Sequence, residues 1–143
     1  MIERKLAKVM LNSEQKVIIV EDFNAHHSWW NAKISNSIRT KVLIKWVNLH
    51  KCNLINTSDV NTYYSYSDQS SSVLDLTFAS KNMCNHIKNW HIDKNVNTEF
   101  NHEVILFTIV IKKVIFLFFI SSLSACSLWL WHCLDAVCML SYM

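Results

Sequence analysis

The sequence predicts an α/β fold in which buried strands alternate with helices. Three segments carry this prediction. Residues 17–20 (VIIV) are a β-branched run, residues 36–50 have the apolar spacing of an amphipathic helix, and residues 104–111 (VILFTIVI) are a second apolar run. Strands covered on both faces appear as such runs, because neither face meets water. The 143 residues suffice for at most one such domain.

The N-terminal elements alternate in type. Residues 1–16 have helical apolar spacing and lead into the strand at 17–20. The helix over 36–50 has Asn36 or Ser37 available as its N-cap.

A group of strands is predicted after that helix. Residues 52–56 read as a short strand, and residues 57–71, rich in Ser, Asp, Asn and Tyr, read as a loop or hairpin. Residues 72–79 alternate as a strand does, with Asp75 in the middle. A connection then leads to a strand around residues 90–92 and on to the final apolar run.

The composition excludes several function classes. The chain contains no Gly and no Pro, so it cannot carry a glycine-rich dinucleotide or Walker A loop, nor a Pro-rich linker. Backbone positions that need positive φ should fall to Asn or Asp. The net charge of +3 is compatible with nucleic acid but too small to argue for it. Five Cys without a CxxC pair indicate free thiols in a reducing, intracellular compartment.

The character of the chain changes after Lys112 and Lys113. Residues 114–134 carry no formal charge over 21 positions, which is long enough to cross a bilayer with the lysine end cytoplasmic. Ser and Cys interruptions and His132 weaken that interpretation. A non-family apolar tail is the other reading.

Polar groups occur at three places where strands should be covered. Asp22 and Asn24 follow the first strand, Asp75 lies within a strand, and Asn101 and His102 precede the last strand. A buried carboxylate is costly unless it is paired, so Asp22, Asp75 and His102 could form a convergent acid/base site. A turn at a strand end and a structural histidine are the local alternatives.

Four segments together resemble one known family. Residues 17–30 (VIIVEDFNAHHSWW) resemble the GDFNAHH-x-W-W signature of the endonuclease/exonuclease/phosphatase superfamily, closest to the endonuclease domain that accompanies the reverse transcriptase of non-LTR (LINE-type) retrotransposons. Residues 71–77 (SSVLDLT) resemble its SSxIDLT strand, and residues 90–92 its tryptophan strand. Residues 98–107 (TEFNHEVILF) stand where the family has GSDHxxIxF. The resemblance covers residues 10–111, the second half of such a domain.

The resemblance implies a DNase I-like sandwich of two β-sheets flanked by helices, and Mg²⁺-dependent nicking of DNA in the nucleus. Asp22 would orient or deprotonate the attacking water, and Asn24 would hold the phosphate. His102 would contact the scissile phosphate, with Asp75 fixing its ring through a hydrogen bond.

The sequence departs from the family at important positions. Glu21 replaces a Gly, and Glu99, Phe100 and Asn101 replace Gly-Ser-Asp. The amide of Asn101 cannot take a proton and is a poorer partner for a divalent cation than a carboxylate. The family's metal-binding Glu lies in its N-terminal half, and nothing before Val17 matches it, so the metal ligands stay unassigned.

We therefore expect a partial endonuclease domain over residues 1–111 and an apolar, non-family tail over residues 112–143. The expected function is that of a truncated and degenerate retrotransposon endonuclease. A catalytically dead fragment with no selected role is the first alternative. A small protein anchored in a membrane through residues 114–134 is the second.

Overall fold

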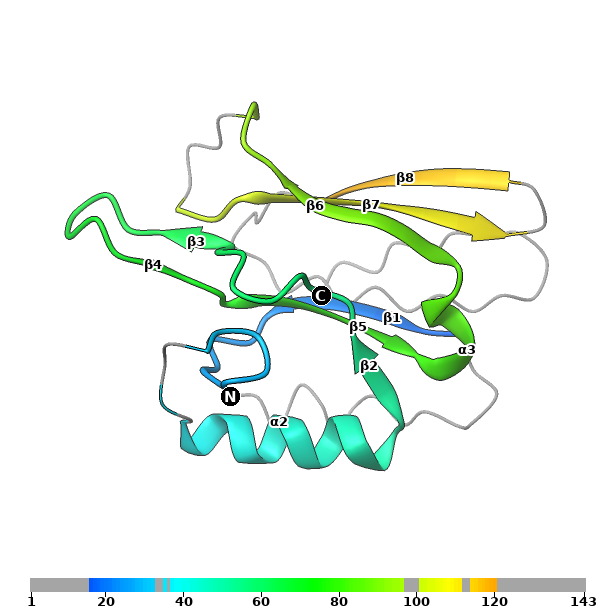
Figure 1. Cartoon of the computed structure of the whole chain (residues 1–143), viewed down its shortest axis with the longest axis horizontal. Coiled ribbons are helices and arrows are strands. Elements are labelled where there is room, and N and C mark those ends of the chain that lie inside the picture. The colour runs from blue at the N-terminus through cyan, green and yellow to red at the C-terminus, as the bar shows by residue number, and fades with distance from the viewer. Residues whose placement is uncertain (1–15, 33–34, 36, 97–100, 112–113, 121–143) are drawn as a thin grey trace, which may run out of the picture.

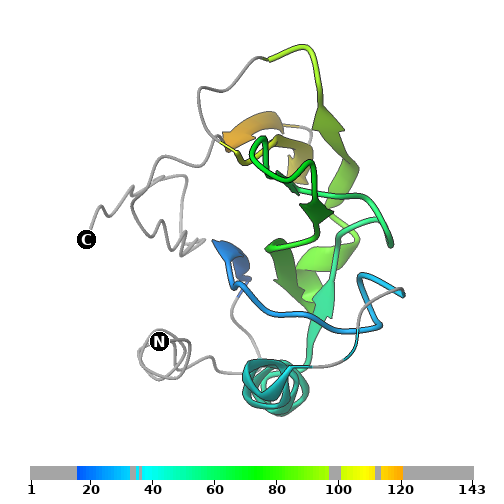
Figure 2. The same cartoon turned by 90° about the vertical axis from the view of Figure 1, so that its left-hand side faces the viewer.

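The computed structural model describes residues 16–32, 35, 37–96, 101–111 and 114–120 (Figure 1). Helix α2 (Ile38–Leu49) covers one face of a three-stranded sheet. A second three-stranded sheet covers the other face, so the first sheet is the middle layer (Figure 2). This layering confirms the predicted α/β class.

The middle sheet is antiparallel, with the strand order β1–β5–β2. Its strands are β1 (Ile18–Asp22), β5 (Asp75–Ser80) and β2 (Cys52–Leu54). Successive side chains of a strand point to opposite faces, so Ile19 packs toward α2 while Ile18 and Val20 pack toward the second sheet. The register of β1 and β5 sets Asp22 directly opposite Asp75.

Helix α2 begins at Ile38 because Ser37 caps it. Ser37 Oγ accepts a hydrogen bond from the Thr40 N–H at 3.3 Å, as a helix N-cap does. The hydroxyl of Thr40 donates to the carbonyl oxygen of His26 at 2.6 Å, which ties the helix to the loop after β1. Of the two predicted caps, Ser37 is confirmed, and Asn36 lies outside the described residues.

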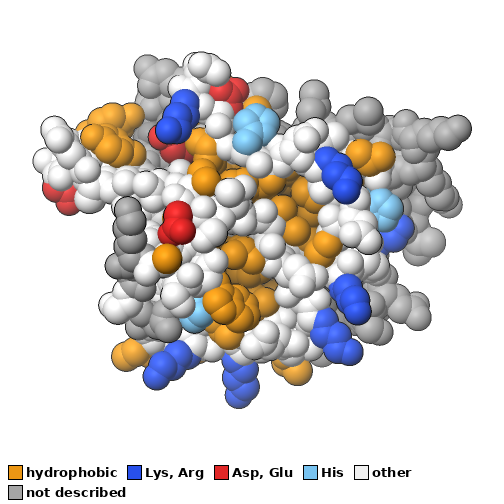
Figure 3. Space-filling view, viewed as in Figure 1, with side chains coloured by type: hydrophobic (Ala, Val, Ile, Leu, Met, Phe, Trp, Pro, Cys, Tyr) orange, Lys and Arg blue, Asp and Glu red, His pale blue; other side chains and the backbone are white. Residues whose placement is uncertain are grey.

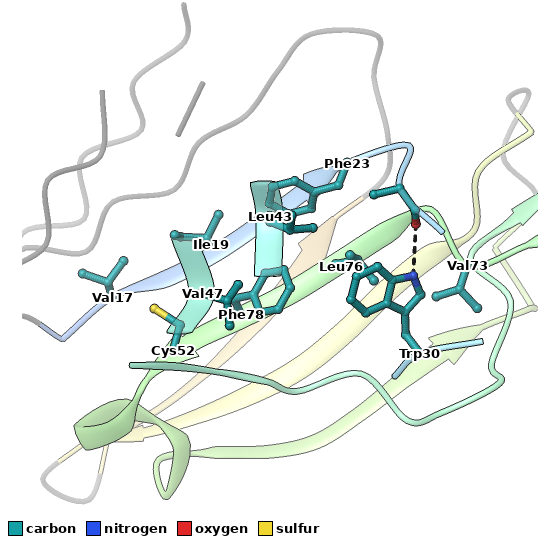
Figure 4. Close-up of a cluster of buried hydrophobic side chains, with 11 residues drawn as sticks. Val17, Ile19, Phe23, Trp30, Leu43, Val47, Cys52, Val73, Leu76 and Phe78 are labelled. Carbon is teal, nitrogen blue, oxygen red and sulfur yellow. Dashed lines mark hydrogen bonds between the residues drawn. The ribbon is translucent and has the colours of Figure 1, made fainter. Parts of the chain in front are cut away.

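The apolar stripe of α2 packs against the middle sheet (Figure 4). Leu43 of the helix and Phe78 of β5 are fully buried there. The ring of Phe78 meets that of Phe23 edge to face, with 5.6 Å between centroids. Trp30 closes the end of this core, and its indole N–H donates to the Ala25 carbonyl at 3.0 Å.

The second sheet has the order β6–β7–β8 and is also antiparallel. Helix α3 connects β5 to it, and the segments are α3 (Lys81–Cys84), β6 (Ile87–Asp93), β7 (Val104–Ile111) and β8 (Val114–Ile120). Apolar side chains of β7 such as Ile105 and Phe107 face the middle sheet. Trp90 of β6 also reaches across, and its indole N–H donates to Thr77 Oγ1 at 3.0 Å.

The segment predicted as a loop or hairpin is a hairpin. Its strands are β3 (Tyr63–Tyr64) and β4 (Ser71–Ser72), which pair in an antiparallel ladder. It projects beyond the body of the molecule at the end where β1 finishes and β5 begins (Figure 1).

Five described residues have left-handed backbone in a chain without Gly. They are Asn24, Lys51, Asp59, Gln69 and Asn89, with φ between 44° and 61°. Asn and Asp were expected at such positions, and Lys51 and Gln69 depart from that expectation. Lys51 follows the end of α2 and its N–H donates to the Asn48 carbonyl at 3.2 Å. Helices commonly end in such a left-handed residue, so here the helix end dictates the conformation.

The segment predicted as an apolar tail begins with a strand. β8 pairs with β7 from Ile111–Val114 to Ile105–Ile120, so residues 114–120 belong to the second sheet. Among the described residues, no helix is long and apolar enough to span a membrane. Residues 121–143, and the predicted helix in residues 1–15, lie outside the described part of the chain.

Candidate active site

An aspartate of the middle sheet and a histidine of the segment before β7 meet at the end of the middle layer beside the β3–β4 hairpin. Asp75 opens β5 and is 7% exposed, and His102 lies two residues before β7. His102 Nδ1 donates to Asp75 Oδ2 at 2.8 Å. This bond fixes the tautomer and places Nε2 on the side of the ring away from Asp75.

The carboxylate also sets the charge of the imidazole. The hydrogen bond that His102 donates to Asp75 raises the pKa of His102 above its ordinary value. Burial opposes this shift, while the negative charges of Asp75 and Asp22 add to it. The fraction of molecules with a protonated His102 is therefore larger at neutral pH than for an isolated histidine.

Asp22 lies beside this pair because the register of β1 places it opposite Asp75. Partial burial, followed by repulsion from Asp75, raises the pKa of Asp22. The Asn24 N–H, which donates to Asp22 Oδ1 at 2.8 Å, and the charge of His102 act in the opposite direction. Asn24 reaches this position with a left-handed backbone at φ 44°. A carboxyl group that binds its proton more readily is better suited to accept one from water.

Asn101 is turned toward the hairpin. Its Nδ2 donates to the Tyr63 hydroxyl at 3.3 Å, and its carbonyl accepts from the Tyr64 N–H at 2.7 Å. The Tyr63 ring stands edge-on to His102, with 5.0 Å between centroids. Hence all five residues predicted for the site lie at the same end of the molecule. The side chain of Asn101 contacts Tyr63, whose ring in turn contacts the ring of His102.

Two buried residues that the sequence did not single out hold Asp75. Thr62 Oγ1 accepts from the Asp75 N–H at 2.9 Å, and Asn56 Nδ2 donates to the Asp75 carbonyl at 3.0 Å. Asn56 Oδ1 also accepts from the Thr77 N–H at 2.6 Å. Both lie in polar stretches where Ser, Thr and Asn abound, so no sequence signal separates them from solvated neighbours.

The two histidines that follow Asn24 serve the local structure. His27 Nδ1 accepts from the Trp29 N–H at 3.1 Å, and its ring packs against Trp29 and Trp30. The His26 carbonyl receives the N–H of Ser37, which precedes α2.

The described side chains do not by themselves fit a resident metal ion. No group of three or more His, Cys, Asp or Glu residues among them could hold one. Asp22 and Asp75 offer carboxylate oxygens, but the Nδ1 of His102 is engaged by Asp75. Mg²⁺ prefers octahedral oxygen ligands, and the two carboxylates supply too few of them.

Comparison with solved structures identifies the fold. The endonuclease domain of TRAS1, a telomere-specific non-LTR retrotransposon, is similar in structure, with a TM-score of 0.63 and 24% identity. The match covers 78% of this chain and 48% of that one, so the chain spans about half the length of that domain. This likeness confirms the DNase I-like fold.

The family follows from the sequence match. The family model described as endonuclease-reverse transcriptase matches residues 1–106, and the chain belongs to that family. No curated protein matches the chain. The resemblance based on the motif at residues 17–30 is thereby confirmed at the level of the family.

Proposed function

We propose that this chain is a retrotransposon-type endonuclease domain that hydrolyses phosphodiester bonds in DNA. The observation that carries the proposal is the 2.8 Å bond between Asp75 and His102, beside the carboxyl of Asp22. Membership of the endonuclease-reverse transcriptase family supports the class of substrate.

The geometry suggests a role for each side chain. His102, made more basic by Asp75, is suited to bind the scissile phosphate as a cation and to stabilise charge as it develops. Asp22, whose pKa is raised, is suited to orient or deprotonate the attacking water. Asn24, held next to Asp22 by its backbone N–H, would offer its side-chain amide to a phosphate oxygen.

We propose further that Asn101 slows this reaction. A carboxylate at this position could accept a proton, whereas the amide donates to Tyr63 and cannot. Removing one such acid/base or charge-stabilising group costs about 10²–10⁴ in rate.

Nicking of supercoiled plasmid by the full chain in Mg²⁺ buffer tests both statements. N101D should nick at least about 10²-fold faster than the unsubstituted chain, and adding His102→Ala should abolish the gain. His91→Ala is the matched control, because His91 is exposed on β6 and its imidazole Nδ1 hydrogen-bonds the carbonyl of Asn89, two residues away on the same strand.

Two results would refute the proposal. Nicking that survives His102→Ala would show that the cleavage arises elsewhere. A folded chain that does not nick, with or without N101D, would be a family member without activity, which is the first alternative raised by the sequence.

A further inference from the structure

Thr62 is fully buried and has no part in the proposed reaction. It lies just before β3, with 0% of its surface exposed. Its Oγ1 accepts two hydrogen bonds, from the N–H groups of Leu74 at 3.0 Å and Asp75 at 2.9 Å. A hydroxyl oxygen has two acceptor positions, so this atom is fully used as an acceptor at the point where β5 begins.

The backbone of Thr62 bonds the segment that carries His102, the partner of Asp75. Its carbonyl accepts from the Glu103 N–H at 2.8 Å, and the Tyr64 N–H donates to the Asn101 carbonyl at 2.7 Å. Between these two bonds Tyr63 and His102 face each other in an antiparallel bridge. A short ladder therefore holds the residues on both sides of His102.

Asn56 offers an instructive contrast. Its side chain also bonds Asp75, but both of its hydrogen bonds are to β5. Nδ2 donates to the Asp75 carbonyl, and Oδ1 accepts from the Thr77 N–H. Thr62, in contrast, bonds β5 with its side chain and the segment before β7 with its backbone. Because β5 and β7 belong to different sheets, the separation of Asp75 and His102 depends on a connection between the sheets at this end.

We infer that Thr62 is a positioning residue that sets the Asp75–His102 geometry, because its hydroxyl holds the backbone of Asp75 and its carbonyl holds the N–H of Glu103, the residue that follows His102. Without that oxygen, two buried N–H groups at the start of β5 lose their acceptor, and the Asp75 carboxylate is free to shift from the imidazole. The catalytic consequence of this inference rests on the proposed function, whereas the geometric one does not.

The test compares matched substitutions in the full chain. Thr62→Val keeps the shape of the side chain and removes the oxygen, and Thr62→Ser keeps the oxygen. Thr77→Val is the control, because Thr77 is equally buried and its hydroxyl accepts from the indole of Trp90.

The first readout is an NMR pH titration of the His102 imidazole, assigned with His102→Gln. Among the described residues, the groups that face this ring include Asp75, Asp22 and Tyr63. In Thr62→Val the pKa of His102 should fall toward its ordinary value of about 6.5. Thr62→Ser should retain the raised pKa, and so should Thr77→Val even if its melting temperature drops as far. An unmoved titration in Thr62→Val, or an equal shift in Thr77→Val, would overturn the inference.

A second readout needs no substitution. The amides of Leu74 and Asp75 should exchange slowly with solvent, because both are bonded to a fully buried oxygen. Rapid exchange at both positions would contradict the hydrogen bonds to Thr62 Oγ1, and with them the inference, even if Thr62→Val failed to fold.

The titration does not depend on cleavage of DNA, so a failure of the proposed function would be recognised separately. Where nicking is measurable, Thr62→Val should lower kcat on the order of 10²-fold with KM unchanged, as expected for misplaced groups. A loss confined to KM would argue against a positioning role.

Discussion

The two faces of the middle sheet differ in what they bury. The face toward α2 carries an apolar cluster, whose members include Ile19, Leu76 and Phe78. The opposite face is apolar at one end, where Ile18, Val20 and Ala79 meet the second sheet. At the other end of that face the side chains become polar, where Asp22 lies opposite Asp75, while Thr77, opposite Val20, lies between the two ends.

This difference shows how one strand serves two purposes. The side chains of β5 alternate between the faces, so Leu76 and Phe78 stabilise the fold while Asp75 and Thr77 supply hydrogen bonds. We therefore expect substitutions on the α2 face to change stability most, and substitutions at the polar end to act through pH and chemistry. Figure 3 shows apolar side chains at the surface as well, so exposure alone does not separate the two classes.

The largest expected effect is on the apolar face. Phe78→Ala should lower the free energy of unfolding by about 3–5 kcal/mol, because it leaves a cavity beside Phe23. Urea denaturation measures this loss. Ile38→Ala, on a side chain 83% exposed, is the control and should change stability by about 0.5 kcal/mol or less. Equal losses of stability in Phe78→Ala and Ile38→Ala would contradict the assignment of Phe78 to the core.

At the polar end, Asp75→Asn should cost about 1–3 kcal/mol, because it weakens the bond to His102. The raised pKa of His102 contributes stability that is fully present below its unfolded pKa, about 6.5, and is lost as pH rises through the folded pKa. The difference between the two proteins should thus be larger at pH 6 than at pH 9 in parallel denaturation curves. A difference that grows with pH would mean that His102 is not the group involved.

The cap of α2 tests a local contribution on the apolar side. Ser37→Ala should cost about 1 kcal/mol, because the Thr40 N–H loses its acceptor. Ser37→Asp retains an acceptor at the cap and should lose much less. Similar melting temperatures for the alanine and aspartate variants would show that packing, not the cap, secures this helix start.

The smallest expected effect has the opposite sign. The pKa of Asp22 is raised in the folded protein, so ionising Asp22 weakens the fold as pH rises above its unfolded pKa. Asp22→Asn should therefore stabilise the chain at pH 7, by less than about 1 kcal/mol because the carboxyl is only partly buried and stays accessible to solvent, and should not do so at pH 3. Under the proposed function the same variant nicks DNA more slowly. A variant that is less stable at pH 7 would contradict the repulsion from Asp75.

Part of the fold was predictable because its signals are local. The β-branched run of β1, the apolar spacing of α2 and the uninterrupted run of β7 each reflect which faces are covered. The extent of the second sheet was not predictable in this way. The composition of residues 114–120 suits a membrane segment and a buried strand equally, and only pairing with β7 distinguishes them.

By itself, the sequence determined the positions of β1, α2 and β7, the family motif and the identity of the five polar residues at one end. Tertiary structure alone decided that Asp75 and His102 lie 2.8 Å apart, that Asp22 stands opposite Asp75, and that Thr62 and Asn56 hold the start of β5. The physical reason is that a strand pattern specifies which face a residue occupies. Register and contacts between sheets specify its neighbours, and these arise only when segments distant in sequence pair.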